Sequence, residues 1–207
     1  MHEMWLERWQ EGRTGWHEDT GNKSLMRHWR VTGRRVLVPL CGKTPDIRWL
    51  ADHGNQVIGV ELSALAVEAF FEEQALTYSR RSDEPRIYES SDQSITIFCG
   101  DYFELQLPRC DAHYDRAALI AMPAELRPAY AARTSALLEP AAEQLVITLE
   151  YDQSVADGPP FSVPERELVR YWPDLVCVDS RDDIENGPPK FIEAGLSELR
   201  QKVWRSP

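Results

Sequence analysis

Hydrophobic positions along the chain switch between short continuous runs and segments with a helical period. The apolar runs predict buried strands at 36–40, 57–61, 94–98, 114–121 and 144–149. Apolar residues at helical spacing predict helices at 44–53, 63–78, 125–138 and 165–171. Strand and helix therefore alternate, which is typical of an α/β fold with a mostly parallel central sheet and helices on both faces.

Other segments stand outside this alternation. The N-terminal segment 3–11 carries Trp5 and Trp9 at helical spacing and ends at Gly12, which predicts a short amphipathic helix ahead of the core. The polar stretch 79–93 predicts an exposed connection. The last third contains a Pro-rich segment at 158–164. It also predicts two further strands, at 175–179 and 197–204, around a loop at 181–190.

Composition bounds the class of protein. The 207 residues include 34 acidic and 23 basic side chains, so the net charge is −11, and 43% of the residues are hydrophobic. This composition predicts one globular domain, residues 1–207. Because an acidic surface repels phosphates, we expect neither nucleic acid nor an anionic membrane surface as a partner. We expect a monomer.

Targeting signals and cysteine spacing point to no particular function. Glu3, Glu7 and Arg8 interrupt the apolar stretch that a secretory signal requires, and the longest apolar run is too short to span a membrane. The four cysteines lack CxxC spacing, which argues against a zinc site and a disulfide framework, so we expect no metal. Reduced thiols favour a cytoplasmic location.

The first two strands suggest a nucleoside-containing cofactor. Glu61 ends the second strand about twenty residues after the loop at Gly42, where an acid commonly binds ribose hydroxyls. A dinucleotide and S-adenosylmethionine both fit this position. The loop favours S-adenosylmethionine, because a pyrophosphate requires several glycines and this loop has one. Asp101, in a Gly-Asp-x-Phe segment after the third strand, could accept from the adenine amino group.

At this point the whole chain resembles the thiopurine S-methyltransferase family, particularly its bacterial members. The resemblance rests on five motifs: Trp5-x-x-x-Trp9-x-x-Gly12-x-Thr14-Gly15-Trp16-His17, Arg35-Val36-Leu37-Val38-Pro39-Leu40-Cys41-Gly42-Lys43, Gly59-Val60-Glu61-Leu62-Ser63, Asp115-Arg116-Ala117-Ala118-Leu119 and Gly158-Pro159-Pro160-Phe161. It implies a Rossmann-like class I methyltransferase fold. It also implies transfer of a methyl group from S-adenosylmethionine to aromatic or heterocyclic thiols such as thiopurines.

The resemblance implies a set of cofactor contacts, namely Trp5, Leu40, Glu61, Asp101, Tyr102 and Arg116. It implies that Trp9 and Trp16 line the acceptor site and that the N-terminal segment, residues 1–30, forms a lid over the cofactor. Because the sulfonium provides both electrophile and leaving group, the protein must mainly hold the nucleophile in line with the methyl group. Arg116 is the candidate cation that favours a thiolate, and Asp115 would orient Arg116 or take a proton through water.

Two alternatives remain open on sequence alone. The acceptor could be a reduced selenium or tellurium compound, in a detoxification reaction. The chain could also be a non-catalytic cofactor-binding module, in which case the acceptor pocket would be closed or Arg116 would point away from it. For the acceptor pocket of an enzyme we expect a mostly apolar lining with one cation, formed by the N-terminal aromatics, the loop after Arg116 and the segment 158–163.

Overall fold

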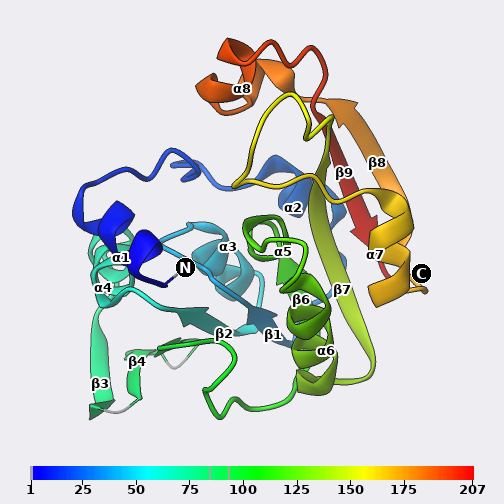
Figure 1. Ribbon diagram of the computed structural model, residues 1–207. Helices are drawn as coiled ribbons and strands as arrows, with labels where there is room; N and C mark the ends of the chain where they lie inside the picture. Colours follow the sequence, from blue (N-terminus) through cyan, green and yellow to red (C-terminus); the bar gives the residue numbers. More distant parts are fainter. Residues whose placement is uncertain (1, 84, 93) are drawn as a thin grey trace.

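A computed structural model of the chain describes residues 2–83, 85–92 and 94–207 (Figure 1). One sheet of nine strands organises the described residues, in the order β3-β4-β5-β2-β1-β6-β7-β9-β8. Its strands are β1 Arg35–Val38, β2 Gln56–Glu61, β3 Tyr78–Asp83, β4 Arg86–Ser90, β5 Ile95–Cys99, β6 Cys110–Asp115, β7 Leu138–Glu150, β8 Val176–Asp182 and β9 Arg200–Arg205. The helices are α1 His2–Gln10, α2 Lys23–His28, α3 Asp46–Asp52, α4 Ala64–Glu73, α5 Ala118–Ala121, α6 Arg127–Leu137, α7 Glu165–Tyr171, η1 Ile184–Asn186 and α8 Pro189–Glu193.

The central strands confirm the expected parallel sheet. Strand β1 pairs in parallel with β2 on one side and with β6 on the other, and the parallel pairs β2–β5 and β6–β7 continue outward. Antiparallel strands β4 and β9 extend the two sides. Because the chain moves in opposite directions from β1, the carboxyl ends of β1 and β6 form a topological switch point, where open α/β sheets bind ligands.

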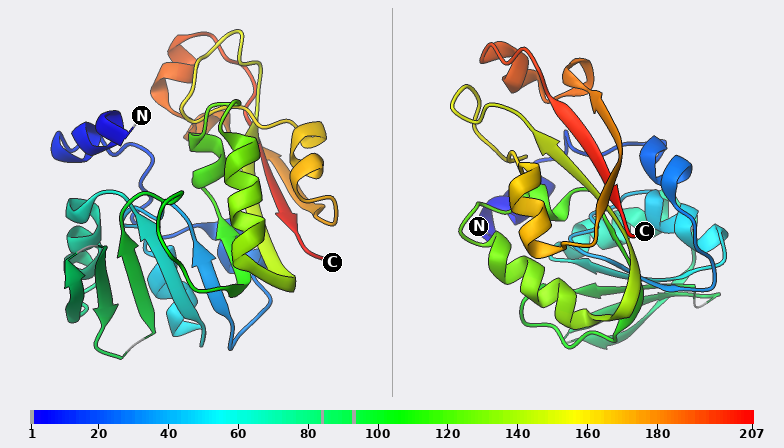
Figure 2. Two further views of the ribbon diagram at one scale, coloured as in Figure 1. Left: turned by 60° about the horizontal axis from the view of Figure 1, so that its bottom comes forward. Right: turned by 90° about the vertical axis from the view of Figure 1, so that its right-hand side faces the viewer.

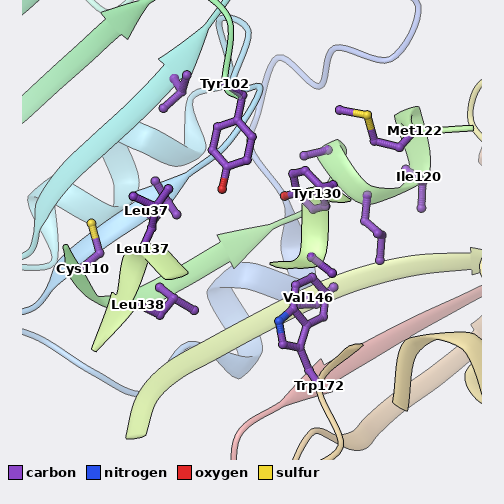
Figure 3. Packing of buried hydrophobic residues seen from close by; sticks show 14 of the residues in the cluster. Leu37, Tyr102, Cys110, Ile120, Met122, Tyr130, Leu137, Leu138, Val146 and Trp172 are labelled. Carbon is purple, nitrogen blue, oxygen red and sulfur yellow. The ribbon is translucent and has the colours of Figure 1, made fainter. Parts of the chain in front are cut away.

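Alternation of side chains along β1 supplies two hydrophobic layers. Leu37 lies in the cluster that contains residues of α5, α6 and α7, whereas Val36 and Val38 lie in the cluster with α2, α3 and α4. Figure 2 shows helices on both sides of the sheet, and Figure 3 shows Leu37 among the side chains of the first cluster. A strand buried on both faces gives a continuous apolar run, which is why the apolar runs of the sequence located β1 and β2.

The expected exposed connection at 79–93 is wrong, although Glu84 and Gln93 themselves lie outside the described residues. Strands β3 and β4 form an antiparallel hairpin there, and β4 pairs with β5. Tyr88 is buried under Phe71 of α4. Polar and charged residues dominate the hairpin because it forms an edge of the sheet, where charges discourage pairing with other chains.

Boundaries differ elsewhere as well. The helix expected over 63–78 ends at Glu73, followed closely by Ala75 with a positive φ of 51°, and Tyr78 begins β3. The segment 114–121, expected as a strand entering a loop, holds the end of β6 and the short helix α5. The loop expected at 181–190 contains the end of β8, η1 and the start of α8.

The N-terminal residues cross the carboxyl ends of the central strands. Helix α1 and the loop that follows it run over the top of the sheet toward α2 (Figures 1 and 2). Helix α2 belongs to the core, since Leu25 is fully buried. We therefore use the name N-terminal arm for His2–Asn22; Met1 lies outside the described residues. No helix in the described part of the chain has the length and apolar character needed to cross a bilayer.

Candidate functional site

The loop after β1 has a backbone shape that few residues tolerate. Leu40 and Gly42 both have positive φ angles, 48° and 54°, and the Cys41 N–H donates to the Val60 carbonyl oxygen at 2.9 Å. The loop is thereby fastened against β2. A non-glycine residue with positive φ costs about 1–2 kcal/mol, and strain of this kind concentrates at ligand sites.

Glu61 lies beneath this loop with only 6% of its surface exposed. Its carboxylate accepts from the N–H of Gly42 and from the N–H of Ser63, both at 2.8 Å. Burial raises the pKa of Glu61, while these backbone donors act in the opposite direction. Each carboxylate oxygen keeps a further lone pair. Glu61 can therefore brace the loop and still accept hydrogen bonds from a ribose, which fits an S-adenosyl cofactor.

Asp101 and Tyr102 follow β5, but their side chains lie in different surroundings. The Asp101 carboxylate accepts from the Phe103 N–H at 2.9 Å and lies 3.4 Å from the His2 ring of α1. Asp101 therefore faces the N-terminal arm. The Tyr102 side chain is buried, its hydroxyl hydrogen-bonded to Thr134 at 2.8 Å, and Figure 3 shows its ring in the core near Tyr130. A contact of Tyr102 with adenine would have to use its backbone.

Asp115 and Arg116 are neighbours in sequence with separate partners. The buried Asp115 carboxylate accepts from the Tyr130 hydroxyl and from the amides of Ala118 and Leu119 at the start of α5. Burial raises the pKa of Asp115 to about 6. Arg116 donates to the Trp16 carbonyl oxygen at 2.8 Å and pairs with the Glu18 carboxylate. The carboxylate partner of Arg116 is thus Glu18 of the arm, where the sequence had suggested Asp115.

Three tryptophans close over the loop. The Trp16 ring makes edge-to-face contacts with Trp5 and Trp9, at centroid distances of 5.2 and 5.7 Å. Arg8 covers Trp5 from 5.0 Å. Trp9 lies directly on the loop, since a Cβ atom added at Gly42 would come within 3.2 Å of its ring. The predicted acceptor aromatics and the predicted cofactor loop therefore meet.

A pocket opens at the switch point between β1 and β6. Its lining combines residues of the arm, the β1 loop and the end of β6, namely Trp9, Trp16, His17, Val38, Pro39, Leu40, Cys41, Gly42, Lys43, Thr44, Asp46, Tyr114, Arg116 and Ala117. Of the predicted residues, it brings together Leu40, Arg116, Trp9 and Trp16. Trp5 adjoins it through Trp16 and Glu61 through Gly42, while the side chains of Tyr102 and Asp115 face the core.

The pocket leaves part of the acceptor prediction outside. Residues 158–163 do not line it; Phe161 instead donates its N–H to the Ile120 carbonyl oxygen at 2.6 Å. Arg116 does line it. Arg116 therefore does not point away from the pocket, which was one of the two features expected of a non-catalytic module. The other feature, a closed pocket, is approached in this structure, since the cavity measures about 40 Å³.

Asp46, at the start of α3, was not anticipated from the sequence. It is 1% exposed, and its two carboxylate oxygens accept from the Asn22 N–H at 2.7 Å and from the Tyr114 hydroxyl at 2.8 Å. The Asn22 side chain in turn donates to Glu18 at 3.2 Å. Asp46 thereby joins the end of the arm to the floor of the pocket. The available signal was an acid just after the β1 loop.

His17 also lines the pocket. It lies 3.2 Å from Asp19 and is mostly covered by its surroundings. Burial lowers the pKa of His17, and the positive charges of Lys43 and Arg116 lower it further, while Asp19 and Glu73 act in the opposite direction. The net effect favours the neutral form of His17.

A second cavity lies between the loop after β7 and the start of β9, lined by Glu150, Tyr151, Asp152, Val155, Gly195, Leu196, Ser197, Glu198, Arg200 and Lys202. Its cations Lys202 and Arg200 are paired with Glu150 and Glu198, as Arg116 is with Glu18. Unlike the cavity at the switch point, it lacks the strained loop and the buried strand-end acid. The cavity at the switch point is the better candidate site.

Sequence comparison identifies relatives over the whole chain. The sequence model of the family "Thiopurine S-methyltransferase (TPMT)" matches residues 1–206. A thiopurine S-methyltransferase of Bordetella petrii is 47% identical, with 98% of this chain and 96% of the relative covered. One of Pseudomonas syringae pv. syringae is 40% identical over the same shares.

Solved structures with similar folds are more distant in sequence. The Burkholderia thailandensis 1,6-didemethyltoxoflavin-N1-methyltransferase, solved with S-adenosylhomocysteine, has a TM-score of 0.62 at 18% identity, with 99% of this chain and 86% of that chain covered. A methyltransferase of Anabaena variabilis dependent on S-adenosylmethionine has a TM-score of 0.61 at 13% identity, with 100% and 95% covered. These similarities confirm the Rossmann-like class I fold.

Proposed function

This chain belongs to the thiopurine S-methyltransferase family, and we propose that it transfers the methyl group of S-adenosylmethionine to the sulfur of aromatic or heterocyclic thiols at the β1–β6 switch point. The observation that carries the proposal is the shared pocket, where the cofactor loop Leu40–Gly42 and the cation Arg116 lie beneath Trp9 and Trp16. Family membership makes the cofactor S-adenosylmethionine.

Cofactor binding would use the ends of three neighbouring parallel strands. Leu40 and the loop after β1 would hold the methionine part, Glu61 after β2 the ribose hydroxyls, and Asp101 after β5 the adenine amino group. The ends of β2 and β5 are already joined, since Gly100 donates its N–H to the Glu61 carbonyl oxygen at 2.9 Å. Parallel strands end at one edge of the sheet, which supports this assignment.

Arg116 would act on the acceptor sulfur. S-adenosylmethionine supplies the electrophilic methyl group and its own leaving group, so the residues of the site need only bind and orient a nucleophile. A guanidinium beside a thiol favours its ionised form. Asp115 is engaged with the amides of α5 and with Tyr130, so we assign to it a positioning role, holding the end of β6 from which Arg116 projects.

The N-terminal arm would act as the lid. Trp5, Trp9 and Trp16 pack mainly on one another and on the β1 loop, and the arm is held to the rest of the site by Arg116 and Asp46. A flat aromatic acceptor suits such a lining better than a hydrated oxyanion, whose desolvation requires several donors. Closure over both ligands would exclude water from the transfer.

The remaining features of the proposal concern the oligomeric state, the partners and the location of the protein. The charge of −11 and the small-molecule pocket support a monomer with no nucleic-acid or membrane partner. The four cysteines are free thiols, which supports a cytoplasmic location. Light scattering during size exclusion tests the first point, since a mass of twice 23.8 kDa would contradict it.

Turnover of thiols by an Arg116→Ala variant tests the function. With labelled S-adenosylmethionine and a panel of aromatic thiols, wild type should form methyl thioethers. Arg116→Ala should lower kcat by about tenfold or more, while the affinity for S-adenosylhomocysteine falls less. Arg48→Ala, which removes a cation paired with Asp52 on the surface of α3, is the matched control and should match wild type.

Two results would contradict parts of this proposal. Absence of turnover by wild type with every thiol in the panel would remove the assigned acceptor class; a reduced selenium compound in the same panel then tests the alternative acceptor. Full thiol turnover by Arg116→Ala, with only the cofactor affinity reduced, would make Arg116 a cofactor ligand with no role toward the nucleophile.

A further inference from the structure

Glu18 is a carboxylate of the N-terminal arm that reaches the cation of the site. It pairs with Arg116, whose other terminal nitrogen donates to the Trp16 carbonyl oxygen. The Asn22 side chain donates to Glu18 at 3.2 Å, and the backbone N–H of Asn22 donates to the buried Asp46. Glu18 therefore has two partners, Arg116 and Asn22.

This arrangement changes the charge that an acceptor meets. A guanidinium has five N–H donors, so the bonds to Glu18 and Trp16 leave donors available to a sulfur atom. The positive charge, however, is compensated by the carboxylate. A thiolate entering the pocket meets an ion pair instead of a free cation, and its attraction to Arg116 is reduced by repulsion from Glu18.

We propose that Glu18 is a specificity-determining residue, which competes with an anionic acceptor for Arg116 and so weakens the preference of the site for thiols that arrive already ionised. The proposal rests on the function proposed above. Discrimination between acceptors then comes from a repulsive element as well as from attraction. The arm that covers the acceptor also sets the charge of the site when it closes.

Two other acids beside the pocket, Asp115 and Asp46, have different partners. Asp115 faces α5 and Tyr130, and Asp46 is engaged by Asn22 and Tyr114. Glu18 keeps 38% of its side-chain surface exposed and Arg116 keeps 21%. Since the pair is only half-buried, Glu18 can turn away from Arg116 without leaving a desolvated charge behind.

Comparison of two thiols on Glu18→Gln tests the proposal. The acceptors share one aromatic ring; the first thiol is ionised at neutral pH, and the second, with the sulfur on a methylene group, is not. The ratio of kcat/KM for the ionised thiol to that for the neutral thiol should rise by about threefold to tenfold in Glu18→Gln. A general loosening of the arm would lower both values and leave the ratio unchanged.

Glu11→Gln provides the matched control, because Glu11 lies on the same arm, carries the same charge and pairs with the exposed Arg13. Its ratio should equal that of wild type. An unchanged or lower ratio in Glu18→Gln would overturn the role of Glu18. Failure of wild type to methylate either thiol would instead contradict the proposed function, so the two failures are distinguishable.

Discussion

The sheet end and the N-terminal arm bound the same pocket by different physical means. At the sheet end, the parallel ladder and backbone donors fix Leu40, Gly42 and Glu61, and the supporting side chains are buried on both faces. The arm has one nine-residue helix, in which Trp9 is the buried residue among those described. It is held by tryptophan edges and a few polar contacts.

This difference between the sheet end and the arm suits two separate tasks, binding the cofactor and covering the acceptor. A cofactor site built on strand ends is formed before any ligand binds, so its residues need little ordering when the ligand arrives. A segment with few buried apolar contacts can open at a small cost in free energy. In the proposed site, a preformed cofactor half would thus face a reversible acceptor half. The variants below perturb one half while the other serves as reference.

Glu61→Ala should have the largest effect, confined to the cofactor half. It removes the acceptor for the Gly42 and Ser63 amides and the expected partner of the ribose. Calorimetry with S-adenosylhomocysteine should show binding weakened by about 1–3 kcal/mol. Glu68→Ala, which removes an α4 carboxylate bonded to Tyr88, should retain the wild-type affinity. Equal affinity in Glu61→Ala would remove Glu61 from the site.

Asp46→Asn should act on the arm with an intermediate effect. An amide offers one acceptor oxygen where the Asn22 N–H and the Tyr114 hydroxyl now have two, so the arm anchor should weaken by about 1–2 kcal/mol. Amide exchange over residues 12–22 should become faster, with β1 and β2 unchanged. Asp52→Asn, on the exposed side of the same helix, is the control. Unchanged exchange in Asp46→Asn would mean that the arm is anchored elsewhere.

Acidification should give the smallest effect, again on the arm. Because burial lowers the pKa of His17, the unfolded or open segment binds a proton more readily, and closure loses stability as pH falls below about 6.5. Protection factors over the arm should therefore decline in mild acid before those of the sheet. His17→Asn should flatten this dependence, and His53→Asn, at an exposed ring stacked on Trp49, should not. A pH dependence that persists in His17→Asn would exclude His17 as its source.

Sequence alone located the β1 loop and the end of β2 well, while their role in binding the cofactor stays a prediction. Strands buried on both faces give apolar runs. Gly42 lies in the loop after β1 and Glu61 is the last residue of β2, so chain order fixes where they lie. The side chains of Asp115 and Tyr102 lie in the core, where the sequence had not placed them. Asp115 and Arg116 are adjacent at the end of a strand, where consecutive side chains point to opposite faces, so only one of them could line the pocket. Tyr102 lies in a turn, and which way a turn side chain packs depends on the helix above it.

The arm was predicted less completely because its contacts are distant in sequence. The family resemblance implied a lid over the cofactor, which stays a prediction. The bonds from Arg116 to Glu18 and from Asp46 to Asn22 join residues that periodicity cannot relate. The hairpin β3–β4 was missed for a different reason, since an edge hairpin of polar residues lacks the apolar alternation by which strands are found.

Amide hydrogen exchange with and without S-adenosylhomocysteine tests the central claim, that a reversible arm closes over a preformed cofactor site. Protection over residues 4–16 should increase when the product cofactor binds, while the amides of β1 and β2, already strongly protected, should change little. Equal protection of residues 4–16 in both states would contradict the account, because the arm would then be a fixed part of the core.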